Sequence, residues 1–467
     1  MIIENDDGLL TEFKNYDFID ARRNKRFKSI VERLQAAPSG NLTKVFVDAK
    51  DLKGAYRFFQ NDKTPFTAML EAHQRRVSER CTSQNVILAI QDSTTVHLPG
   101  AAKAKGINKI GDLKRNHPGL NVHSTLLLTP SRIPMGVADL QIYERELISP
   151  DSREQHYKLP AEEKETGRWL KSIENVRKSF GNDLRLVWIS DREADFWDYF
   201  AKLIECGEQF VQRVTHNRPA VGEEQDYFEL AKQAPVVGVH RFEVGGKGGK
   251  DKRPTRTATC EVRSTIVSIK RPKKVKRGMK HYEVRVIHVL EKTKTPSKSP
   301  LEWFIVTNIP CESSEDILEK IRWYCLRWTI EELHRTFKSG CEVEEMRLEF
   351  KNSLLKLLFL LFVTAMRILW ISKLANQGDN ELCTEAFSEE EWKLVYWHRN
   401  KRKPPPDYTP TLKEMVKWVA ALGGFYEYIQ KRVPGAMTLW RGMRRLGEMM
   451  ATYDLLLTEY MPIRNAP

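Results

Sequence analysis

The sequence has few cysteines, and none of them forms a Cys-x-x-Cys pair. The seven are scattered, at positions 81, 206, 260, 311, 325, 341 and 383. A zinc ribbon needs closely spaced ligand pairs, and a small secreted scaffold needs a disulfide framework, so neither is indicated. We therefore expect reduced thiols and a cytoplasmic protein.

The sequence also lacks a long uninterrupted apolar run and a recognisable signal peptide. The first residues are acidic and polar rather than basic and then apolar. The one membrane candidate, Leu354 to Leu369, is interrupted by Lys356 and Arg367, which leaves an apolar stretch of about ten residues. Such a stretch is too short to span a bilayer, so we expect a buried core helix and no membrane partner.

Acidic residues are too few to balance the basic ones. The 467 residues carry a net charge of +14 and are 41% apolar, enough for a packed protein of about two to four domains. A surplus of positive charge suggests a polyanionic partner, most often nucleic acid. The alternative, a basic protein without such a partner, stays open on charge alone.

One stretch, Ile321 to Gly340, reads as a single helix because it has no proline and ends at a glycine. At 100° per residue, an apolar arc about 60° wide and a polar arc of similar width are separated by about 120°. The apolar arc consists of Leu326, Ile330, Leu333 and Phe337, and the polar arc of Tyr324, Arg327, Glu331 and Lys338. The polar side could hold a metal and phosphates, although an ordinary amphipathic helix with a solvated face would look the same.

Two predicted strands are each followed by an aspartate. The apolar run of residues 86–90 leads to Asp92, and residues 184–190 lead to Asp191. The C-terminal ends of strands are where α/β sheets place their chemistry. With Glu331, these acids could provide the carboxylate oxygens that divalent cations need for phosphoryl transfer. Alternatively, Asp191 caps the following helix, and the spacings alone decide nothing.

The rest of the chain suggests three further regions. Residues 1–80 read as helical and basic, with arginines beside aromatics that suit either core packing or a small DNA-binding head. Residues 216–310 read as a β-rich insertion with a basic turn that is either solvated or a phosphate-backbone contact. Residues 412–457 read as helical, with a Met- and Trp-bearing stripe that is either core or a self-association surface.

Several short motifs match those of one known family. The most specific is Tyr324-x2-Arg327-x3-Glu331-x6-Lys338. The other matches are Gln91-Asp92-Ser93-Thr94-Thr95, the Asp191 to Asp195 run, Val122-His123-Ser124, Phe210-Val211-x-Arg213, Leu422-Gly423-Gly424-Phe425 and the Gly54 to Phe58 cluster. On these residues, from about position 20 onward, the chain resembles the DDE transposases of bacterial cut-and-paste insertion sequences, the insertion-sequence-four family of the transposon-five kind.

The resemblance implies an α/β (α+β) fold built on an RNase H-like mixed-sheet core. The catalytic core would span residues 71–375 and contain the β-rich insertion at about 216–310. A helical DNA-binding domain would occupy residues 1–70, and a helical dimerisation domain residues 376–467. The protein would be bacterial, cytoplasmic and associated with the nucleoid, and it would act as a homodimer in a complex with transposon ends.

The resemblance also implies the roles of the site residues. Asp92, Asp191 and Glu331 would be catalytic and would bind two Mg²⁺ or Mn²⁺ ions per active site. Trp303 would stack on a flipped base. The remaining contacts to end DNA would come from Arg22, Arg23, Arg26, Arg57, Arg213, Tyr324, Arg327 and Lys338.

The implied reaction begins with binding of the transposon end repeats and nicking of a 3′ strand by water. The new 3′-hydroxyl would attack the opposite strand to form a hairpin, which would reopen before transfer to target DNA. Two other classes stay open: a transposase-derived DNA-binding regulator and a stand-alone RNase H-like nuclease. A regulator would be expected to have lost an acid, and a nuclease would not need the end-binding and C-terminal regions.

Overall fold

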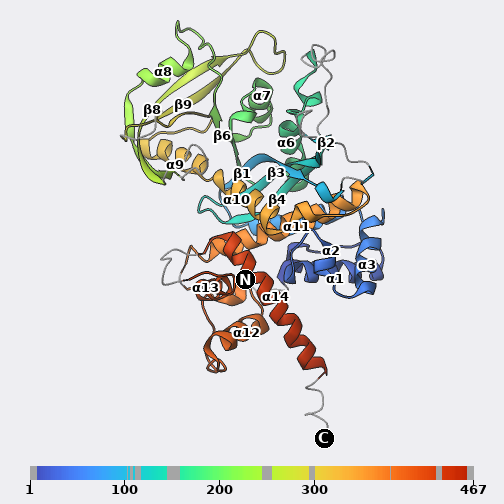
Figure 1. Ribbon diagram of the computed structural model, residues 1–467. Helices are drawn as coiled ribbons and strands as arrows, with labels where there is room; N and C mark the ends of the chain where they lie inside the picture. The colour runs from blue at the N-terminus through green and yellow to red at the C-terminus, as the bar shows by residue number, and fades with distance from the viewer. Residues whose placement is uncertain are drawn as a thin grey trace.

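A mixed sheet of ten strands runs through the upper half of the molecule in Figure 1, with helices on both faces. The computed structural model describes residues 8–101, 104–105, 109–110, 117–144, 158–244, 255–293, 300–378, 380–426 and 434–459. In sheet order the strands are β2 (Lys109–Ile110), β3 (His117–Leu128), β1 (Ile87–His97), β5 (Leu186–Ser190), β6 (Gln209–Val214), β10 (Glu302–Thr307), β9 (His281–Glu291), β8 (Arg256–Lys270) and β7 (Val236–Val244), with β4 (Pro134–Tyr143) paired to β3.

The sheet has an antiparallel part and a parallel part. Strands β1, β3 and β4 form an antiparallel meander, whereas β5 runs parallel to β1 and β6 parallel to β5. The four strands of the predicted β-rich insertion form as expected. They continue the same sheet, because β10 pairs with β6 in antiparallel register.

Strand β1 continues past Asp92, which corrects the predicted position of Asp92 after the end of a strand. The apolar run ends at Ile90, but the backbone stays paired with β3 as far as His97. Asp92 therefore lies within β1 and not after its end. The apolar run marks only the part of β1 that is covered on both faces.

Helices separate the molecule into layers. One face of the sheet packs against α6 (Gly167–Phe180), α7 (Trp197–Glu205) and α8 (Tyr227–Gln233). The other face is covered by the segments that follow β10. These are α9 (Ser314–Cys325), α10 (Trp328–Arg335), the π-helical turn η6 (Thr336–Gly340) and α11 (Lys351–Leu374). Short 3₁₀ turns complete this part: η2 (Pro99–Ala101), η4 (Ala161–Glu163), η5 (Arg192–Ala194) and η7 (Val343–Glu345).

The stretch Ile321 to Gly340 is not the single helix that the sequence predicted. Helix α9 ends at Cys325, two turn residues follow, and α10 runs only to Arg335. The remaining residues form the wider turn η6. The apolar arc still anchors the stretch, because Ile330, Leu333 and Phe337 are fully buried.

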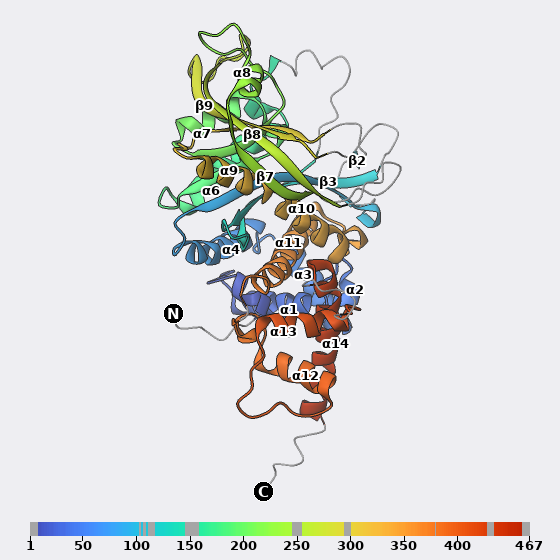
Figure 2. The ribbon, with the colours of Figure 1, turned by 90° about the vertical axis from the view of Figure 1, so that its left-hand side faces the viewer.

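The N-terminal helices share a hydrophobic core with the sheet and α11. They are η1 (Gly8–Glu12), α1 (Ala21–Ala36), α2 (Leu42–Val45), α3 (Ala49–Gln60) and α4 (Phe66–Cys81). Phe27 and Phe59 are completely buried in this core. Lys356 of α11 is buried too, and its Nζ donates to the carbonyls of Phe59 at 3.0 Å and Asn61 at 2.8 Å. Figures 1 and 2 both show α1 to α3 lying beside α11.

Helix α11 is long and apolar enough to cross a membrane by length and composition, but 89% of its most apolar window is buried inside the protein. A helix that is apolar all round and covered on all sides is typical of a protein core. The expected buried core helix is confirmed. The proposed domain boundaries at residues 70 and 375 stay a prediction.

The C-terminal region is helical as expected within the described residues, although positions 427–433 lie outside them. It contains η8 (Cys383–Glu385), α12 (Glu389–Asn400), α13 (Leu412–Leu422) and α14 (Ala436–Glu459). Of the predicted Met- and Trp-bearing stripe, Leu439, Trp440, Met443 and Leu446 are buried against α11 to α13. These residues form an internal core, the first of the two interpretations that the sequence left open.

Candidate active site

The register of the sheet brings Asp92 and Asp191 side by side. The last paired residues of the parallel strands β1 and β5 are Ile90 and Ile189. Each aspartate lies two residues further on, so both project from the same face of the sheet. This is the face that α9 and α10 cover. Asp191 also accepts a hydrogen bond from the backbone of Glu193 at 2.9 Å, so it caps the short 3₁₀ turn η5 and not, as the alternative predicted, the following helix, α7.

A buried polar contact fixes α10 over Asp92. Ser124 of β3 lies directly opposite Asp92 in the antiparallel register. Its hydroxyl is 3.0 Å from Nε2 of His334, one turn after Glu331 on α10. Burial lowers the pKa of His334 to about 3, with Lys338 and Arg327 acting in the same direction, so this imidazole is neutral. Glu331 is therefore held on the side of the sheet that carries the two aspartates.

Arg327 connects two of the three acids. Its Nη1 donates to Oδ2 of Asp92 at 3.1 Å, and its Nη2 donates to Glu331. Burial raises the pKa of Asp92 to about 7; Arg327 opposes this, while the neighbouring charges of Asp191 and Glu331 raise the pKa further. Asp191 and Glu331 therefore lie close enough to Asp92 to act on it electrostatically.

The carboxylate oxygens of the three acids are of the kind that hard divalent cations bind, but the side chains are not grouped as a metal site. Carboxylate oxygens are the ligands that Mg²⁺ and Mn²⁺ prefer, and three of them in one partly buried region need a compensating positive charge. Here Arg327 supplies that charge. In the described parts of the chain, no three His, Cys, Asp or Glu side chains are grouped as a metal site. The guanidinium of Arg327 pairs with two of the three carboxylates, those of Asp92 and Glu331.

Beside the acids lies a cluster of Arg213, Trp303 and Tyr324. Arg213 follows Gln212 of β6, which is level with Ser190 of β5, so it projects from the same face as the aspartates. Its guanidinium carbon is 5.6 Å from the centre of the Trp303 ring. Tyr324 meets that ring edge-on at 5.3 Å. The predicted DNA contacts Arg213, Trp303 and Tyr324 are thus brought together.

Trp303 is only half-buried, but its ring already has a stacking partner. Phe242 of β7 lies 5.0 Å away at an interplanar angle of 22°. A base would have to share the indole with Phe242 or displace it. The structure thus allows both interpretations of Trp303, as a core aromatic and as a stacking platform.

The other predicted DNA contacts are divided between two places. Lys338 lies with Asp92 and Glu331 around a hollow of about 400 Å³, and it has no ion-pair partner among the described residues. The N-terminal arginines lie on α1 and α3. There, Arg22 and Arg57 are exposed, whereas Arg23 donates to the carbonyl of Phe18 at 2.6 Å and Arg26 pairs with Asp51 at 2.9 Å.

Some residues near the acids were missed by the sequence interpretation. Trp328 follows Arg327 and is 56% exposed, and its position in the matched motif was the only available signal. Arg168 of α6 donates to the hydroxyl of Ser93 at 3.0 Å, across 75 positions that no local pattern connects. Glu332, the neighbour of Glu331, pairs with Arg132 at 2.8 Å and with Lys373.

Comparisons with known proteins point to one kind of activity. Residues 9–64 match the family model described as transposase DNA-binding, and residues 363–453 match the transposase Tn5 dimerisation domain. A solved synaptic complex of piggyBac transposase with hairpin DNA is similar over 95% of this chain and 74% of that chain, at 10% identity. Its TM-score of 0.33 is too low to carry an argument. The two family models, near opposite ends of the chain, support a DNA transposase with a DNA-binding and a dimerisation region.

Proposed function

We propose that the protein is a DDE transposase of the insertion-sequence-four, transposon-five-like family, with an RNase H-like core. The observation that carries the proposal is the convergence of Asp92, Asp191 and Glu331 on one face of a mixed sheet. The matches to transposase DNA-binding and dimerisation models support it. The antiparallel meander followed by two parallel strands supports the RNase H-like part.

The three carboxylates would hold Mg²⁺ or Mn²⁺. When bound, such ions activate a water or hydroxyl for in-line attack and stabilise the leaving oxygen. Arg327, Tyr324 and Lys338 would hold backbone phosphates of the transposon end, because a guanidinium, a phenol and an ammonium all donate to phosphate oxygens. A phosphate that draws Arg327 away would release Asp92 and Glu331 for the cation.

The substrate would be transposon end repeats, bound as a protein dimer in the bacterial cytoplasm at the nucleoid. Nicking, hairpin formation, reopening and transfer of the 3′ ends to target DNA would take place at this one site. Trp303 would receive a flipped base during hairpin formation. The N-terminal arginines Arg22, Arg23, Arg26 and Arg57 would contact end DNA.

A pair of neighbouring glutamates tests the proposal. Glu331→Gln should abolish Mg²⁺-dependent cleavage of DNA carrying the inverted repeats that flank the reading frame, with end binding retained. Glu332→Gln is the matched control, since it removes a carboxylate held by Arg132 and Lys373 and should lower thermal stability but leave cleavage measurable. Cleavage by Glu331→Gln at the wild-type rate would refute the assignment. Wild-type cleavage without preference for the repeats would instead indicate a stand-alone nuclease.

A further inference from the structure

Strand β1 has an open edge beyond the catalytic acids. Its pairing with β5 stops at Ile90, while its pairing with β3 continues to His97. Among the described residues, no strand pairs with the β5 side of β1 from Asp92 onward. Such an edge presents backbone N–H and C=O groups that have no sheet partner. These groups are available to a ligand.

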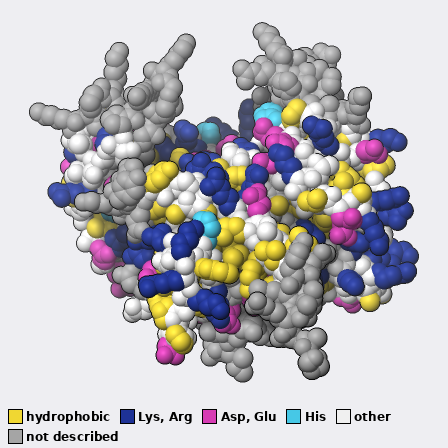
Figure 3. All heavy atoms as spheres, turned by 60° about the horizontal axis from the view of Figure 1, so that its bottom comes forward, with side chains coloured by type: hydrophobic (Ala, Val, Ile, Leu, Met, Phe, Trp, Pro, Cys, Tyr) yellow, Lys and Arg dark blue, Asp and Glu magenta, His cyan; other side chains and the backbone are white. Residues whose placement is uncertain are grey.

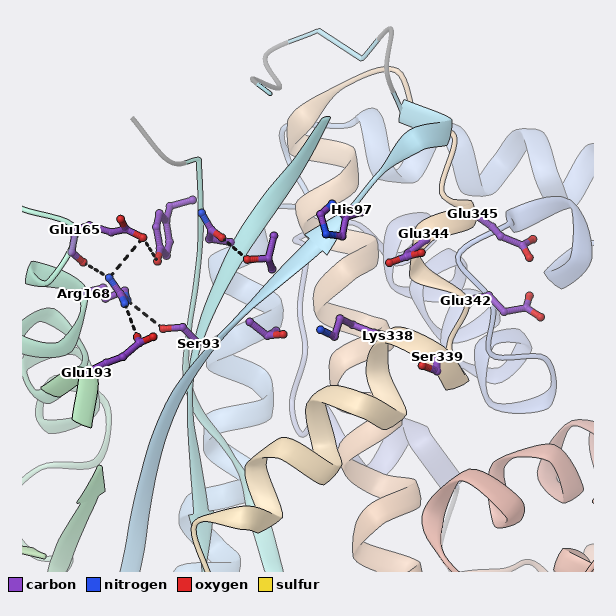
Figure 4. A pocket seen from close by; sticks show the side chains of 14 residues that line it. Ser93, His97, Glu165, Arg168, Glu193, Lys338, Ser339, Glu342, Glu344 and Glu345 are labelled. Atoms are coloured by element: carbon purple, nitrogen blue, oxygen red, sulfur yellow. Dashed lines mark hydrogen bonds and ion pairs between the residues drawn. The ribbon is translucent and has the colours of Figure 1, made fainter. Parts of the chain in front are cut away.

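A hollow of about 880 Å³ lies along this edge and is named the β1-edge hollow; it is lined by residues 93–97 of β1 and by residues on either side. Figure 4 shows Arg168 and Glu193 on one side of the strand and Lys338 and Ser339 on the other. Ser93, Thr94, Lys338 and Ser339 also line the smaller hollow that holds Asp92 and Glu331. The two hollows therefore share a wall and continue from one into the other.

The floor of the β1-edge hollow contains a buried donor that has no partner. Asn121 of β3 is 7% exposed, and its Oδ1 accepts from the hydroxyl of Thr95 at 2.9 Å. Its Nδ2 is buried and has no hydrogen-bond partner among the residues that the structure describes. Tyr143 of β4 is directly opposite Asn121 in the register, so a ring lies beside the donor. A buried amide donor without a partner is costly and indicates a polar ligand.

Most of the acids around the β1-edge hollow are already neutralised. Glu193 pairs with Arg168 at 3.0 Å, and Glu342 pairs with Lys44 and with Arg444, both at 3.1 Å. Glu345 pairs with Lys44 at 2.7 Å. Lys338 has no ion-pair partner within the described residues. The hollow can therefore accept an anion, with affinity coming more from stacking and hydrogen bonds than from charge.

We propose that the β1-edge hollow binds the second DNA, the target strand that the transposon 3′-hydroxyl attacks. This inference rests on the proposed function. Asp92 and His97 are about 17 Å apart along the strand, the rise of about five nucleotides in one strand of B-DNA. Tyr143 would stack against a base, Asn121 would donate to a base edge, and the open edge of β1 would contact phosphates.

The position of the hollow separates target DNA from end DNA. The cluster of Arg213, Trp303 and Tyr324 lies over β6 and β10, on the β5 side of Asp92, and the β1-edge hollow lies beyond Asp92 along β1. The attacking oxygen forms a new P–O bond to the target phosphorus, the target P–O3′ bond breaks, and the leaving 3′-oxygen takes up a proton. This transfer reaction requires the transposon end and the target DNA to meet at Asp92, Asp191 and Glu331.

The experiment separates cleavage from transfer in the full-length protein. Tyr143→Ala should lower transfer of a pre-cleaved end into plasmid DNA about tenfold, the effect of losing one base–aromatic stack, with end cleavage unchanged. Tyr143→Phe keeps the ring and should behave like wild type. Target DNA containing iodouracil should crosslink to the wild type and lose this crosslink in Tyr143→Ala.

A gain-of-function variant avoids the question of misfolding. Glu344 is exposed at the rim of the β1-edge hollow and forms no ion pair within the described residues, so Glu344→Lys should increase transfer and steepen its salt dependence by about one counterion. Glu390→Lys, a charge reversal on exposed α12, should do neither. Normal transfer by Tyr143→Ala, or equal loss of cleavage and transfer, would overturn the target assignment. Absence of cleavage by the wild type would overturn the proposed function instead.

Discussion

Arg327 donates from Nη1 to Oδ2 of Asp92 at 3.1 Å, across 235 positions of the sequence. The same guanidinium also pairs with Glu331, four residues further along. The sequence predicted that Arg327 contacts DNA phosphate and that Asp92 binds metal. Without DNA, Arg327 and Asp92 form an ion pair with each other. The chain itself therefore supplies a counter-charge for two of the three acids, and a phosphate and a divalent cation would have to replace the two halves of this ion pair.

The first prediction concerns this competition. Arg327→Ala should bind Mn²⁺ more tightly than the wild type when no DNA is present, because the guanidinium no longer occupies the carboxylate oxygens. Calorimetry or the EPR signal of free Mn²⁺ measures the difference. Arg322→Ala is a suitable control, since that arginine pairs with exposed Glu315 at 2.5 Å on α9. Equal Mn²⁺ affinity of Arg327→Ala and wild type would show that Arg327 does not compete with the ion.

The second prediction concerns Trp303. Trp303→Ala should slow hairpin formation about tenfold or more, because a base stacked on an indole is stabilised by about 1–3 kcal/mol, and nicking should stay near normal. Trp303→Phe should retain part of the effect. Phe242→Ala removes the aromatic partner of Trp303 but leaves the indole in place. Any loss of hairpin formation in this variant therefore measures how much the packing of Phe242 against Trp303 contributes. Equal loss of nicking and hairpin formation in Trp303→Ala, with a lowered melting temperature, would make Trp303 a core residue.

The third prediction concerns a buried polar cluster between α4 and the sheet. His73 is buried, with Nδ1 3.0 Å from the carbonyl of Glu12 and Nε2 accepting from the N–H of Val137 at 3.0 Å. These contacts require a neutral ring, and burial lowers the pKa of His73 to about 4. Burial acts to raise the pKa of Glu12, but Arg80, His73 and Arg367 outweigh it and lower that pKa to about 2.

The lowered pKa values of His73 and Glu12 both make the fold less stable as the pH falls. A depressed pKa stabilises the fold above the unfolded value and loses this effect as pH falls through the folded value. The free energy of unfolding should therefore decrease from about pH 6.5 to 4 through His73, and from about pH 4.5 to 2 through Glu12. Urea unfolding at several pH values measures this. Glu12→Gln should remove the lower part of the decrease, whereas exposed Glu390→Gln should not.

The strands near the site could be predicted from the sequence, because apolar runs report burial on both faces directly. The position of Asp92 could not. Beyond Ile90, β1 keeps its hydrogen bonds to β3 although its pairing with β5 has ended. Backbone hydrogen bonds do not depend on whether a side chain is apolar, so the pattern of apolar residues could not predict this continuation. The open edge beside Asp92, and the β1-edge hollow with it, follow from that difference in strand length.

Polar contacts between residues far apart in the sequence could not be predicted either. The hydroxyl of Ser124 meets His334 across 210 positions, and this contact sets α10 over the acids. The break after Cys325 was also missed, since Leu326 and Arg327 keep helical backbone angles and carry no glycine or proline signal. The motif spacing still identified Tyr324, Arg327 and Glu331 as neighbours of the site, because short stretches of helix preserve their relative positions.

The last prediction concerns the surface that joins two copies. Residues 363–453 match a dimerisation model, but the apolar stripe of α14 near Trp440 is buried within the chain. The remaining exposed apolar residues of α14 include Leu456, 48% exposed, and Leu457, 38% exposed, near the end of the helix. These last turns reach away from the sheet in Figures 1 and 2. Figure 3 shows apolar side chains among many Lys and Arg side chains on the face that carries the C-terminal helices.

A double variant, Leu456→Asp and Leu457→Asp, should therefore remain folded but form a complex of one protein with one DNA end. Charged side chains at the centre of an apolar contact are strongly unfavourable, whereas at exposed positions of a monomer they cost little. Light scattering of the end-bound complex measures the stoichiometry. Trp397→Asp on α12, where the indole is 50% exposed, is the control inside the family match, which ends at residue 453, just before the two leucines. If Trp397→Asp gave the single complex and the leucine variant stayed dimeric, the interface would lie on α12. Because cut-and-paste transfer must keep two ends together, the variant that loses the dimer should also lose coupled transfer of both ends.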